Sequence, residues 1–490
     1  MYKQLQIVAI YVAILTTMLD ASIANLILPN IAADLYIDIR FSSWIVTSFG
    51  VGMVVAFALS TLLNDYFTTD GSLLIGCVVF MLSSVGCAYS DHINTLLAYR
   101  FIQGISSGLI LVVSLVTFYR IIGEEKRAFA QSLWGSAITM APVIGPMCGA
   151  VITEALNWRW LFLVNIPMMT FSVIILLPSF DLRRFKDVHK LNKLWVIIPF
   201  VSGVMCFQWV LDFGDIRGWF ADPMICYVAA ASAISAFIFY VINQRFVLFD
   251  FAVFKDTHYA VFTTILCIGN GLIMTSLVML PIYLRTDFGM PVLIAGIVVS
   301  VASGVSAVCS PLVGKFVPPR FFGFCAVLSM FFSAISFYQM SLFGSGTSIE
   351  SIIISRIFAG MGIVFFSLPY TVLSLKHLQT EQIVNASSIS LMFRTFLANT
   401  FIAVAFISSG HMRHLQEIEF ISNIDRHTLI KYGGELPVQA SIYLSKTFSN
   451  NAVAFVFEVT ALMFFACMLV TAYFVVYLSR KESKNKEKGE

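Results

Sequence analysis

The chain has 490 residues, of which 59% are hydrophobic and only 12% are charged, and its formal net charge at pH 7 is +3. So few charges could not cover the surface of a soluble protein, and so small a net charge gives no reason to expect a nucleic-acid partner. The sequence contains no G-x-x-x-x-G-K-[ST] nucleotide-binding motif and no H-E-x-x-H metal motif. An ATP-driven pump and a zinc enzyme are therefore not indicated, and no cofactor is expected.

Fourteen apolar runs follow one another along the chain, each about as long as the roughly 20-residue helix that crosses a hydrocarbon core of ~30 Å. They lie near residues 5–28, 42–63, 72–89, 95–118, 128–153, 158–178, 194–212, 223–243, 259–284, 291–313, 321–343, 350–374, 386–410 and 451–479. The predicted fold class is all-α and integral to a membrane. The first run carries Asp20 and no small-residue cleavage site, so we interpret it as a retained helix and not as a signal peptide.

A weak internal repeat divides most of these runs into two blocks of six. The segments YRFIQGISSG (99–108) and SRIFAGMGIV (355–364) both place a glycine four residues after an arginine, and each opens the fourth helix of its block. Repeats of this kind are typical of transporters. The predicted units are a six-helix bundle at 1–185, two additional helices with linkers at 186–250, a second six-helix bundle at 251–479 and a tail at 480–490.

The distribution of basic residues predicts the orientation of the chain. If the N-terminus is cytoplasmic, nineteen Lys and Arg residues fall in the loops and tail on that side and eight fall on the other side. The positive-inside rule then places both termini in the cytoplasm. All nine cysteines fall inside the apolar runs, where they are expected to pack as small hydrophobes without a disulfide framework.

One long hydrophilic segment, at about 411–450, is expected to form a loop on the non-cytoplasmic side. A loop of this length is uncommon in a compact domain, so a contact role and a solvated connector are equally reasonable interpretations. The final residues, SRKESKNKEKGE, have the composition of a disordered, membrane-proximal tail.

Charged residues within the apolar runs need a reason, because a charge at the centre of a spanning helix costs about 2.5–3.5 kcal/mol on insertion scales. They are Asp20, Arg100, Asp212, Arg356, Arg394 and Glu458. Asp20 is expected to bind a proton or to contact substrate, and the alternative is a structural ion pair with Arg100. Arg100 has the same two interpretations. For Asp212 and Glu458, packing or a position at the lipid interface is favoured.

The fifth run is unusually rich in glycine and proline. It contains Gly135, Pro142, Gly145, Pro146 and Gly149. Glycine permits the close approach of two helices, and proline removes a backbone hydrogen-bond donor. We therefore expect this helix to be kinked and closely packed, as a hinge would be.

Polar and aromatic residues at eight positions are candidates for the lining of a substrate cavity. They are Asn25, Gln103, Trp134, Asn165, Gln208, Asn270, Phe366 and Tyr370. For the aromatic residues a core or lipid-facing position is the commoner alternative. No metal site is expected, since the histidines lie in or beside loops and His411 with His414 is interpreted as a solvated pair.

Several stretches of the sequence resemble a known family. They are LDASIANLILPNIAADL (19–35), SSWIVTSFGVG (42–52), RFIQGISSG (100–108), APVIGPMCGA (141–150), NWRWLFLVNIP (157–167) and LDFGDIRGWF (211–220). Over nearly its whole length the chain resembles the 14-helix drug:proton antiporters of the major facilitator superfamily, and most nearly their EmrB type from Gram-negative bacteria. The resemblance implies the major facilitator fold, with two six-helix bundles plus two extra central helices.

The resemblance also implies roles for single residues. Asp20 corresponds to the helix 1 aspartate that couples proton and substrate, and Arg100 to the helix 4 arginine of proton transfer. The family's antiporter motif on helix 5 corresponds to Gly145, Pro146 and Gly149.

Two departures from the family pattern stand out. The loop between helices 2 and 3 usually reads G-x-L-x-D-R-x-G-R, but TLLNDYFTTDG keeps only the aspartate, Asp65, of its Gly and charged positions. The cytoplasmic gate built on that loop is therefore expected to be weakened or rebuilt. The last glycine of the helix 5 motif is replaced by Ala150, which is a mild change.

These observations predict a proton-driven exporter of hydrophobic or amphipathic small molecules in the bacterial inner membrane. The resemblance implies a tripartite system with an EmrA-like periplasmic adaptor and an outer-membrane channel as partners. One alternative is a dedicated exporter of a single metabolite, such as a siderophore, which would account for the diverged gate loop. An alternative of another class is a receptor or scaffold that has lost transport, against which Asp20 and Arg100 argue.

Overall fold

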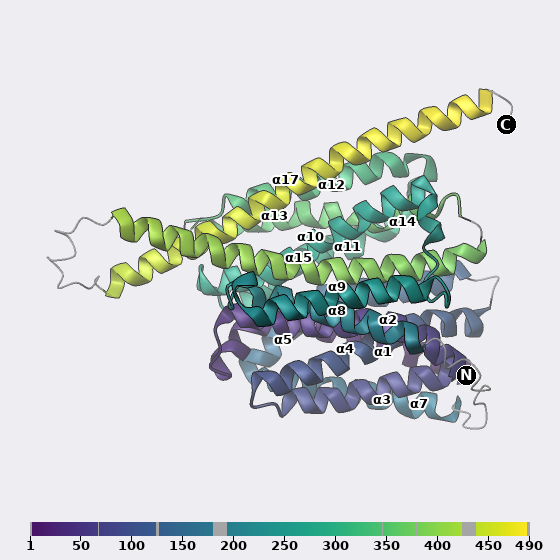
Figure 1. The fold of residues 1–490 in the computed structure, drawn as a ribbon, viewed down its shortest axis with the longest axis horizontal. Coiled ribbons are helices and arrows are strands. Elements are labelled where there is room, and N and C mark those ends of the chain that lie inside the picture. Colours follow the sequence, from purple (N-terminus) through teal and green to yellow (C-terminus); the bar gives the residue numbers. More distant parts are fainter. Residues whose placement is uncertain are drawn as a thin grey trace.

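The computed structural model describes residues 2–66, 68–123, 127–179, 194–344, 346–378, 380–423 and 438–487. Within these ranges all regular structure is helical, and 14 stretches are long and apolar enough to span a membrane (Figure 1). Each stretch overlaps one of the fourteen predicted runs, so the predicted fold class is confirmed.

The helices follow the predicted order. The first half contains α1 (Tyr2–Asp34), α2 (Ser43–Tyr66), α3 (Thr69–Ala88), α4 (Ile93–Ile122), α5 (Arg127–Ala155), α6 (Arg159–Leu163) and α7 (Asn165–Leu176). The additional pair is α8 (Leu194–Gly214) and α9 (Pro223–Asn243). The second half contains α10 (Thr257–Thr286), α11 (Val292–Phe316), α12 (Phe322–Ser341), α13 (Ile349–Val364), α14 (Ser367–Leu375), α15 (Thr380–Asn423) and α17 (Val438–Glu487). The short helices α6 and α7 together make one span, as do α13 and α14.

Short polar side chains fix the start of several helices. Thr68, Asp256 and Ser348 each accept a hydrogen bond from an amide in the first turn of α3, α10 and α13, respectively. At the start of α9, Asp222 does the same and Pro223 occupies the first helical position. These caps satisfy amide groups that the first turn of a helix leaves unpaired, so the chain enters the membrane with its backbone donors engaged.

The two halves pack side by side, each around its own helix pairs (Figure 1). In the first half α1 packs on α5, and α2 and α3 pack on α4. In the second half α10 packs on α15, α11 on α13 and α12 on α17. The halves meet where α5 packs on α11, α2 on α15 and α1 on α10. Helix α8 packs on α9 and also contacts both α2 and α15, so the additional pair covers one seam between the halves.

Both chain ends lie at one end of the bundle, here called the terminal end, and α1 finishes at the opposite, distal end (Figure 1). Near the distal end α5 and α11 touch, because a Cβ on Gly296 would lie 2.7 Å from the carbonyl oxygen of Pro146. Gly135 lies on the same face of α5 about three turns earlier, and a Cβ there would meet nothing within 4 Å. Helices α5 and α11 are thus in close contact near the distal end, and α5 has open space beside Gly135 toward the terminal end.

The long hydrophilic segment differs from its prediction. Residues 411–423 continue α15 and residues 438–450 belong to α17, and the two helices protrude beyond the distal end (Figure 1). Residues 424–437 lie outside the described ranges. The segment is hydrophilic but rich in good helix formers, and Arg413 pairs with Glu417 one turn later at 3.1 Å. The charged tail was likewise expected to be disordered, but α17 continues through most of it.

Candidate functional site

A network of buried polar side chains connects α1, α3, α4 and α7. The carboxylate of Asp20 on α1 places Oδ2 2.5 Å from a guanidinium nitrogen of Arg100 on α4. Its Oδ1 accepts hydrogen bonds from the side-chain amides of Asn165 on α7, at 2.7 Å, and Gln103 on α4, at 3.3 Å. Ser84 on α3 joins the network by accepting a hydrogen bond from Gln103 at 2.8 Å. Asp20 is therefore held as a carboxylate by one cation and two neutral donors.

The guanidinium of Arg100 is also engaged on its other sides. Its Nε donates to the backbone carbonyl of Ile45 on α2 at 3.3 Å, and one terminal nitrogen donates to Oε1 of Gln103 at 2.7 Å. The ring of Phe49 lies 4.4 Å from the guanidinium carbon, within the range of a cation–π contact. Arg100 thus joins α1, α2 and α4, and the ion pair with Asp20, which the sequence offered as the alternative interpretation, is present in this conformation.

The ion pair is sealed from water. The side chains of Arg100 and Asp20 are 1% and 2% exposed, and in such a place a charge left without its partner is strongly unfavourable. Arg100 has further acceptors on Ile45 and Gln103, whereas Asp20 has no cation other than Arg100 among the described ion pairs. Separation of the two side chains would therefore leave Asp20 as a buried charge without a cation.

The glycines of α5 bring that helix directly against α1 beside the network. A Cβ on Gly145 would lie 3.0 Å from the Cβ of Ser22, and a Cβ on Gly149 would lie 2.8 Å from a methyl group of Ile23. Both partners follow Asp20 closely in α1, so the predicted close packing of the fifth helix falls at the level of the network.

A neighbouring face of α5 contacts the second half of the protein. Pro146 and Ala150 face Gly296 on α11, where a Cβ would lie 3.3 Å from the Cβ of Ala150. The alanine that departs from the family motif therefore fits because its partner on α11 is a glycine. Helix α5 thus connects the helix that carries Asp20 with the opposite half.

Two charged contacts close the distal end between the halves. Arg285 on α10 donates to the carbonyl of Leu26 at 3.3 Å and to the side chain of Asn30, both near the C-terminal end of α1. Glu154 on α5 accepts a hydrogen bond at 3.0 Å from the amide of Leu293, in the first turn of α11. Each charge is complementary to the dipole of the helix end that it caps.

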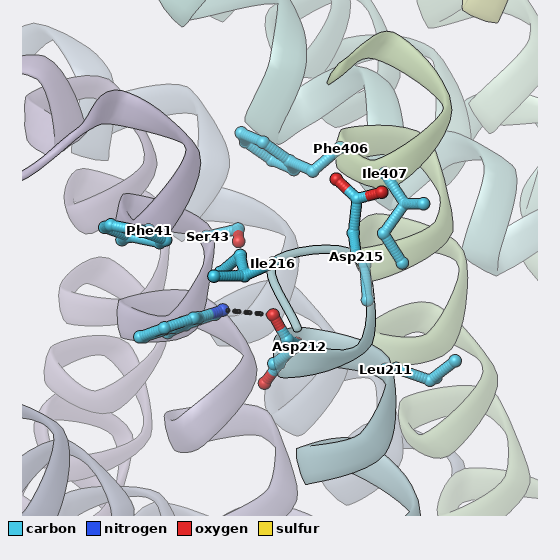
Figure 2. A pocket seen from close by; sticks show the side chains of 10 residues that line it. Phe41, Ser43, Leu211, Asp212, Asp215, Ile216, Phe406 and Ile407 are labelled. Carbon is cyan, nitrogen blue, oxygen red and sulfur yellow. Dashed lines mark hydrogen bonds between the residues drawn. The ribbon is translucent and has the colours of Figure 1, made fainter. Parts of the chain in front are cut away.

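Asp212 attaches the additional helix α8 to α2 (Figure 2). Its carboxylate accepts hydrogen bonds from Thr47 at 3.0 Å and from Gln208 at 2.9 Å, and its carbonyl accepts one from the indole of Trp44 at 3.1 Å. The indole stacks on Phe213 with ring centroids 4.1 Å apart. Trp44 and Asp212 also border a small cavity of about 30 Å³ between α2, α8 and α15, which Asp215 and Phe406 line from other sides (Figure 2).

The other cavity candidates lie in several places. The side-chain oxygen of Asn25 is buried without a hydrogen-bond partner on the distal side of Asp20. Trp134 donates to the carbonyl of Leu111 at 3.1 Å and so fastens α5 to α4. Asn270 on α10 accepts a hydrogen bond from Arg394 on α15 at 3.3 Å.

Phe366 and Tyr370 lie in the packed core of the second half and line no cavity in this conformation. Phe366 is 3% exposed and fills the space beside Gly269 on α10. The hydroxyl of Tyr370 bonds to Thr471 on α17 at 2.8 Å and to the carbonyl of Ala326 on α12 at 3.2 Å. Both residues occupy the core position that was the alternative for aromatic candidates. The sequence of an apolar helix does not distinguish a core position from a cavity wall.

The gate loop between α2 and α3 is only partly described, and the side chain of Asp65 lies outside the described residues. At its far side Asp70, in the first turn of α3, forms an ion pair with Arg120 in the last turn of α4. This pair fastens two helices of the same half at the terminal end.

Sequence reasoning missed three residues that the structure places in important contacts. Ser84 carried a weak signal as a hydroxyl within an apolar run. Arg285 and Glu154 lie near helix ends, where charges are common, so nothing in the sequence distinguished them.

Comparison with known proteins identifies the family. The model described as Major Facilitator Superfamily matches residues 10–402. The probable multidrug resistance protein EmrY of Escherichia coli (strain K12) is 26% identical, and the alignment covers 94% of each chain. The multidrug export protein EmrB of the same strain is 25% identical, with 92% of this chain and 90% of that one covered. The fatty acid resistance protein FarB of Neisseria gonorrhoeae is 26% identical, with 80% and 78% covered.

The fold has a counterpart among solved structures. A peptide transporter POT in complex with sulfate superposes with a TM-score of 0.61 at 13% identity, covering 96% of this chain and 95% of that one. At this identity the likeness shows the fold alone. The family match, the 14 spanning helices and the relatives, which are transporters and not enzymes, agree with one another. This chain belongs to the major facilitator superfamily of membrane transporters.

Proposed function

We propose that this transporter exports hydrophobic or amphipathic small molecules across the bacterial inner membrane in exchange for protons. The buried pair of Asp20 and Arg100 carries the proposal, because it is a carboxylate that can take up a proton only by giving up its cation. The similarity to EmrY, EmrB and FarB, named for multidrug or fatty acid resistance, supports the class of substrate.

The described conformation fits one step of such a cycle. The positive-inside rule assigns the terminal end to the cytoplasm, so the close contact of α5 with α11 and the two charged contacts at the distal end lie on the periplasmic side. We therefore interpret the conformation as inward-facing. In this inward-facing conformation Asp20 is paired with Arg100, as is expected after proton release and before export. Opening of the distal end would then let Asp20 take up a proton from outside while the substrate leaves.

The protruding ends of α15 and α17 are the proposed contact for a periplasmic adaptor. They extend beyond the distal end (Figure 1), which the orientation assigns to the periplasm. Leu415 and Ile418 on α15 are 47% and 50% exposed there, beside charged residues. A surface of this mixed kind suits a modest, partly polar protein interface.

The test of the exporter is made with purified protein in proteoliposomes that contain a pH-sensitive dye. Addition of ethidium or of a medium-chain fatty acid should release protons from the lumen of vesicles with an imposed pH gradient, and the same gradient should drive uphill movement of the compound. Vesicles with Asp20→Asn protein serve as the control. The proposal would be contradicted if uphill movement of the compound and the proton flux were the same in vesicles with and without the protein.

The adaptor contact is tested separately in cells and vesicles. Replacement of residues 412–449 by a short Gly/Ser linker should leave proton-coupled transport in vesicles unchanged and abolish resistance in intact cells. Full resistance after the replacement, together with no crosslink from Gln416 to a co-expressed adaptor, would make the segment a connector.

A further inference from the structure

Two arginines in the second half lack the kind of partner that Arg100 has. Arg394 on α15 donates to the side-chain oxygen of Asn270 on α10 at 3.3 Å, and its Nε is buried without a hydrogen-bond partner. Arg356 on α13 contacts the sulfur of Met340 at 3.8 Å, and its Nε is equally unpartnered. Within the described part of the chain, no carboxylate forms an ion pair with either guanidinium.

A buried charge without a partner raises the free energy of the folded protein, and the first half supplies partners for its buried arginine. There, Arg100 has a carboxylate, an amide oxygen and a backbone carbonyl. The acidic residue on the neighbouring helix α17 gives no such help in the second half, because Glu458 is exposed on the helix surface. The second half therefore contains two buried or partly buried arginines without a carboxylate partner among the described residues.

The two unpaired arginines differ in access. Arg356 is 1% exposed and enclosed by the core, so no ligand reaches it in this conformation. Arg394 is partly exposed, in the first third of the span of α15. Asn270 also donates from its amide nitrogen to the carbonyl of Arg394 at 3.4 Å, so it holds both the backbone and the guanidinium. The buried Nε–H has no acceptor among the described residues, and the exposed part of the side chain is where an acceptor can approach.

We propose that Arg394, positioned by Asn270, receives the anionic group of an amphipathic organic acid, so that the transporter prefers acids to neutral or cationic compounds of the same shape. A guanidinium binds a carboxylate or sulfonate through charge-assisted hydrogen bonds, which are strong where water is excluded. The positive field of the second half adds to this preference. The inference rests on the proposed export function and names its substrate class.

The test uses three probes with one aromatic body and different charge: 2-naphthylacetate, its methyl ester, and 2-(2-naphthyl)ethylammonium. Binding of each probe is measured by calorimetry with the full chain in nanodiscs of neutral lipid. The acid should bind at least about tenfold more tightly than the ester, the gain expected from one charge-assisted contact. Equal affinity for acid and ester, tighter binding of the ammonium compound, or no binding of the acid would overturn the inference.

Two variants assign the effect to this pair of residues. Asn270→Asp keeps the size of the side chain and gives Arg394 an internal carboxylate, so the acid should lose about tenfold in affinity while the ester is unaffected. Arg394→Gln should lose the same preference, and Arg394→Lys should keep part of it because the charge remains. Unchanged acid binding in Asn270→Asp and Arg394→Gln would exclude the site.

The same variants separate this inference from the proposed function. With the inference correct, the unaltered protein should move both ethidium and the naphthylacetate against a pH gradient, and Arg394→Gln should fail with the naphthylacetate. If the variant moves both compounds normally, the exporter stands and the acid site falls. If the unaltered protein moves neither compound, the exporter itself fails.

Discussion

The carboxylate of Asp20 on α1 lies 2.5 Å from the guanidinium of Arg100 on α4, with both side chains sealed from water. Two whole predicted helices, 42–63 and 72–89, separate the two residues in the sequence, yet they form the one ion pair that the structure describes with both side chains below 5% exposure. A contact of this kind joins protonation of one residue to movement of the other, and the first two predictions follow from it.

Asp20→Asn should abolish uphill export while the protein still inserts and folds. The amide keeps the size of the side chain and can bond to Asn165, but it cannot bind and release a proton. Export driven by a pH gradient in proteoliposomes is the measurement, with size-exclusion behaviour in detergent as the control for folding. Gradient-driven efflux at the unaltered rate would show that the coupling proton binds elsewhere.

Arg100→Ala should reduce transport to background, and Arg100→Lys should retain part of it. Lysine restores the charge beside Asp20 but cannot also reach the carbonyl of Ile45 with a second fixed donor. Initial rates of efflux in vesicles, normalised to the amount of inserted protein, distinguish the three forms. Normal transport by Arg100→Ala would reduce the pair to a packing element.

Gly145→Leu should block the change between inward-facing and outward-facing conformations, since its side chain would collide with Ser22 on α1. Gly135→Leu on the same helix is the matched control, because a side chain there meets open space. Labelling of an introduced cysteine from either side of the membrane, with and without a pH gradient, reports the change. The control protein should still alternate. If Gly145→Leu protein also alternates, the close packing of α5 on α1 is not needed for the conformational change.

Loss of the distal contacts should shift the protein toward an outward-facing conformation. Arg285→Ala removes the cap on the end of α1, and Glu154→Gln weakens the cap on α11 by removing its charge. A cysteine at position 25, where the side-chain oxygen of the asparagine is buried in the closed form, should then be labelled several-fold faster from outside. Labelling at the original rate in the double variant would mean that apolar packing alone keeps this end closed.

The start of α9 should loosen in acid. The amide of Met224 and the side chain of Arg217 donate to Asp222 and hold the pKa of its carboxyl below the usual value. Because the folded pKa is the lower one, this stabilisation is present at neutral pH and is lost as the pH falls below about 4. Hydrogen exchange at residues 219–226 should quicken in that range, and Asp222→Ala should show the fast exchange already at pH 7. Asp222→Asn, which can still cap, is the control. Equal exchange in the alanine variant and the parent at pH 7 would exclude the cap.

The fold could be predicted from the sequence because each spanning helix carries its own signal, an apolar run of the required length. The same signal gave no warning that α15 and α17 continue beyond the membrane, because hydropathy measures partition into lipid and not helix formation. Residues 411–423 are hydrophilic and helical at once. Length and polarity alone therefore describe the membrane part of a helix better than its ends.

Several members of the site could be predicted, and the ion pair of Asp20 with Arg100 was one of two interpretations, but the other contacts could not be predicted. Asp20 and Arg100 are conspicuous because charge is costly in an apolar run, and Gln103 and Asn165 were among the polar candidates. That Asn165 bonds to Asp20 depends on the rotation of α7 against α1, which helix periodicity does not fix across 145 residues. Because the rotation of α15 against α10 is likewise not fixed by the sequence, the amide of Asn270 could not be predicted as the neighbour of Arg394.

The contact between Ala150 and Gly296 implies that α11 has no room for a side chain where it crosses α5. A methyl group at position 296 would meet both the Cβ of Ala150 and the carbonyl oxygen of Pro146, so the residue on α11 depends on the backbone of α5 as well as on its side chains. A glycine restored on α5 alone would leave a void, and an alanine added on α11 alone would press against the carbonyl of Pro146. Grafting α5 or α11 between members of this superfamily would therefore succeed only when both helices are transferred together.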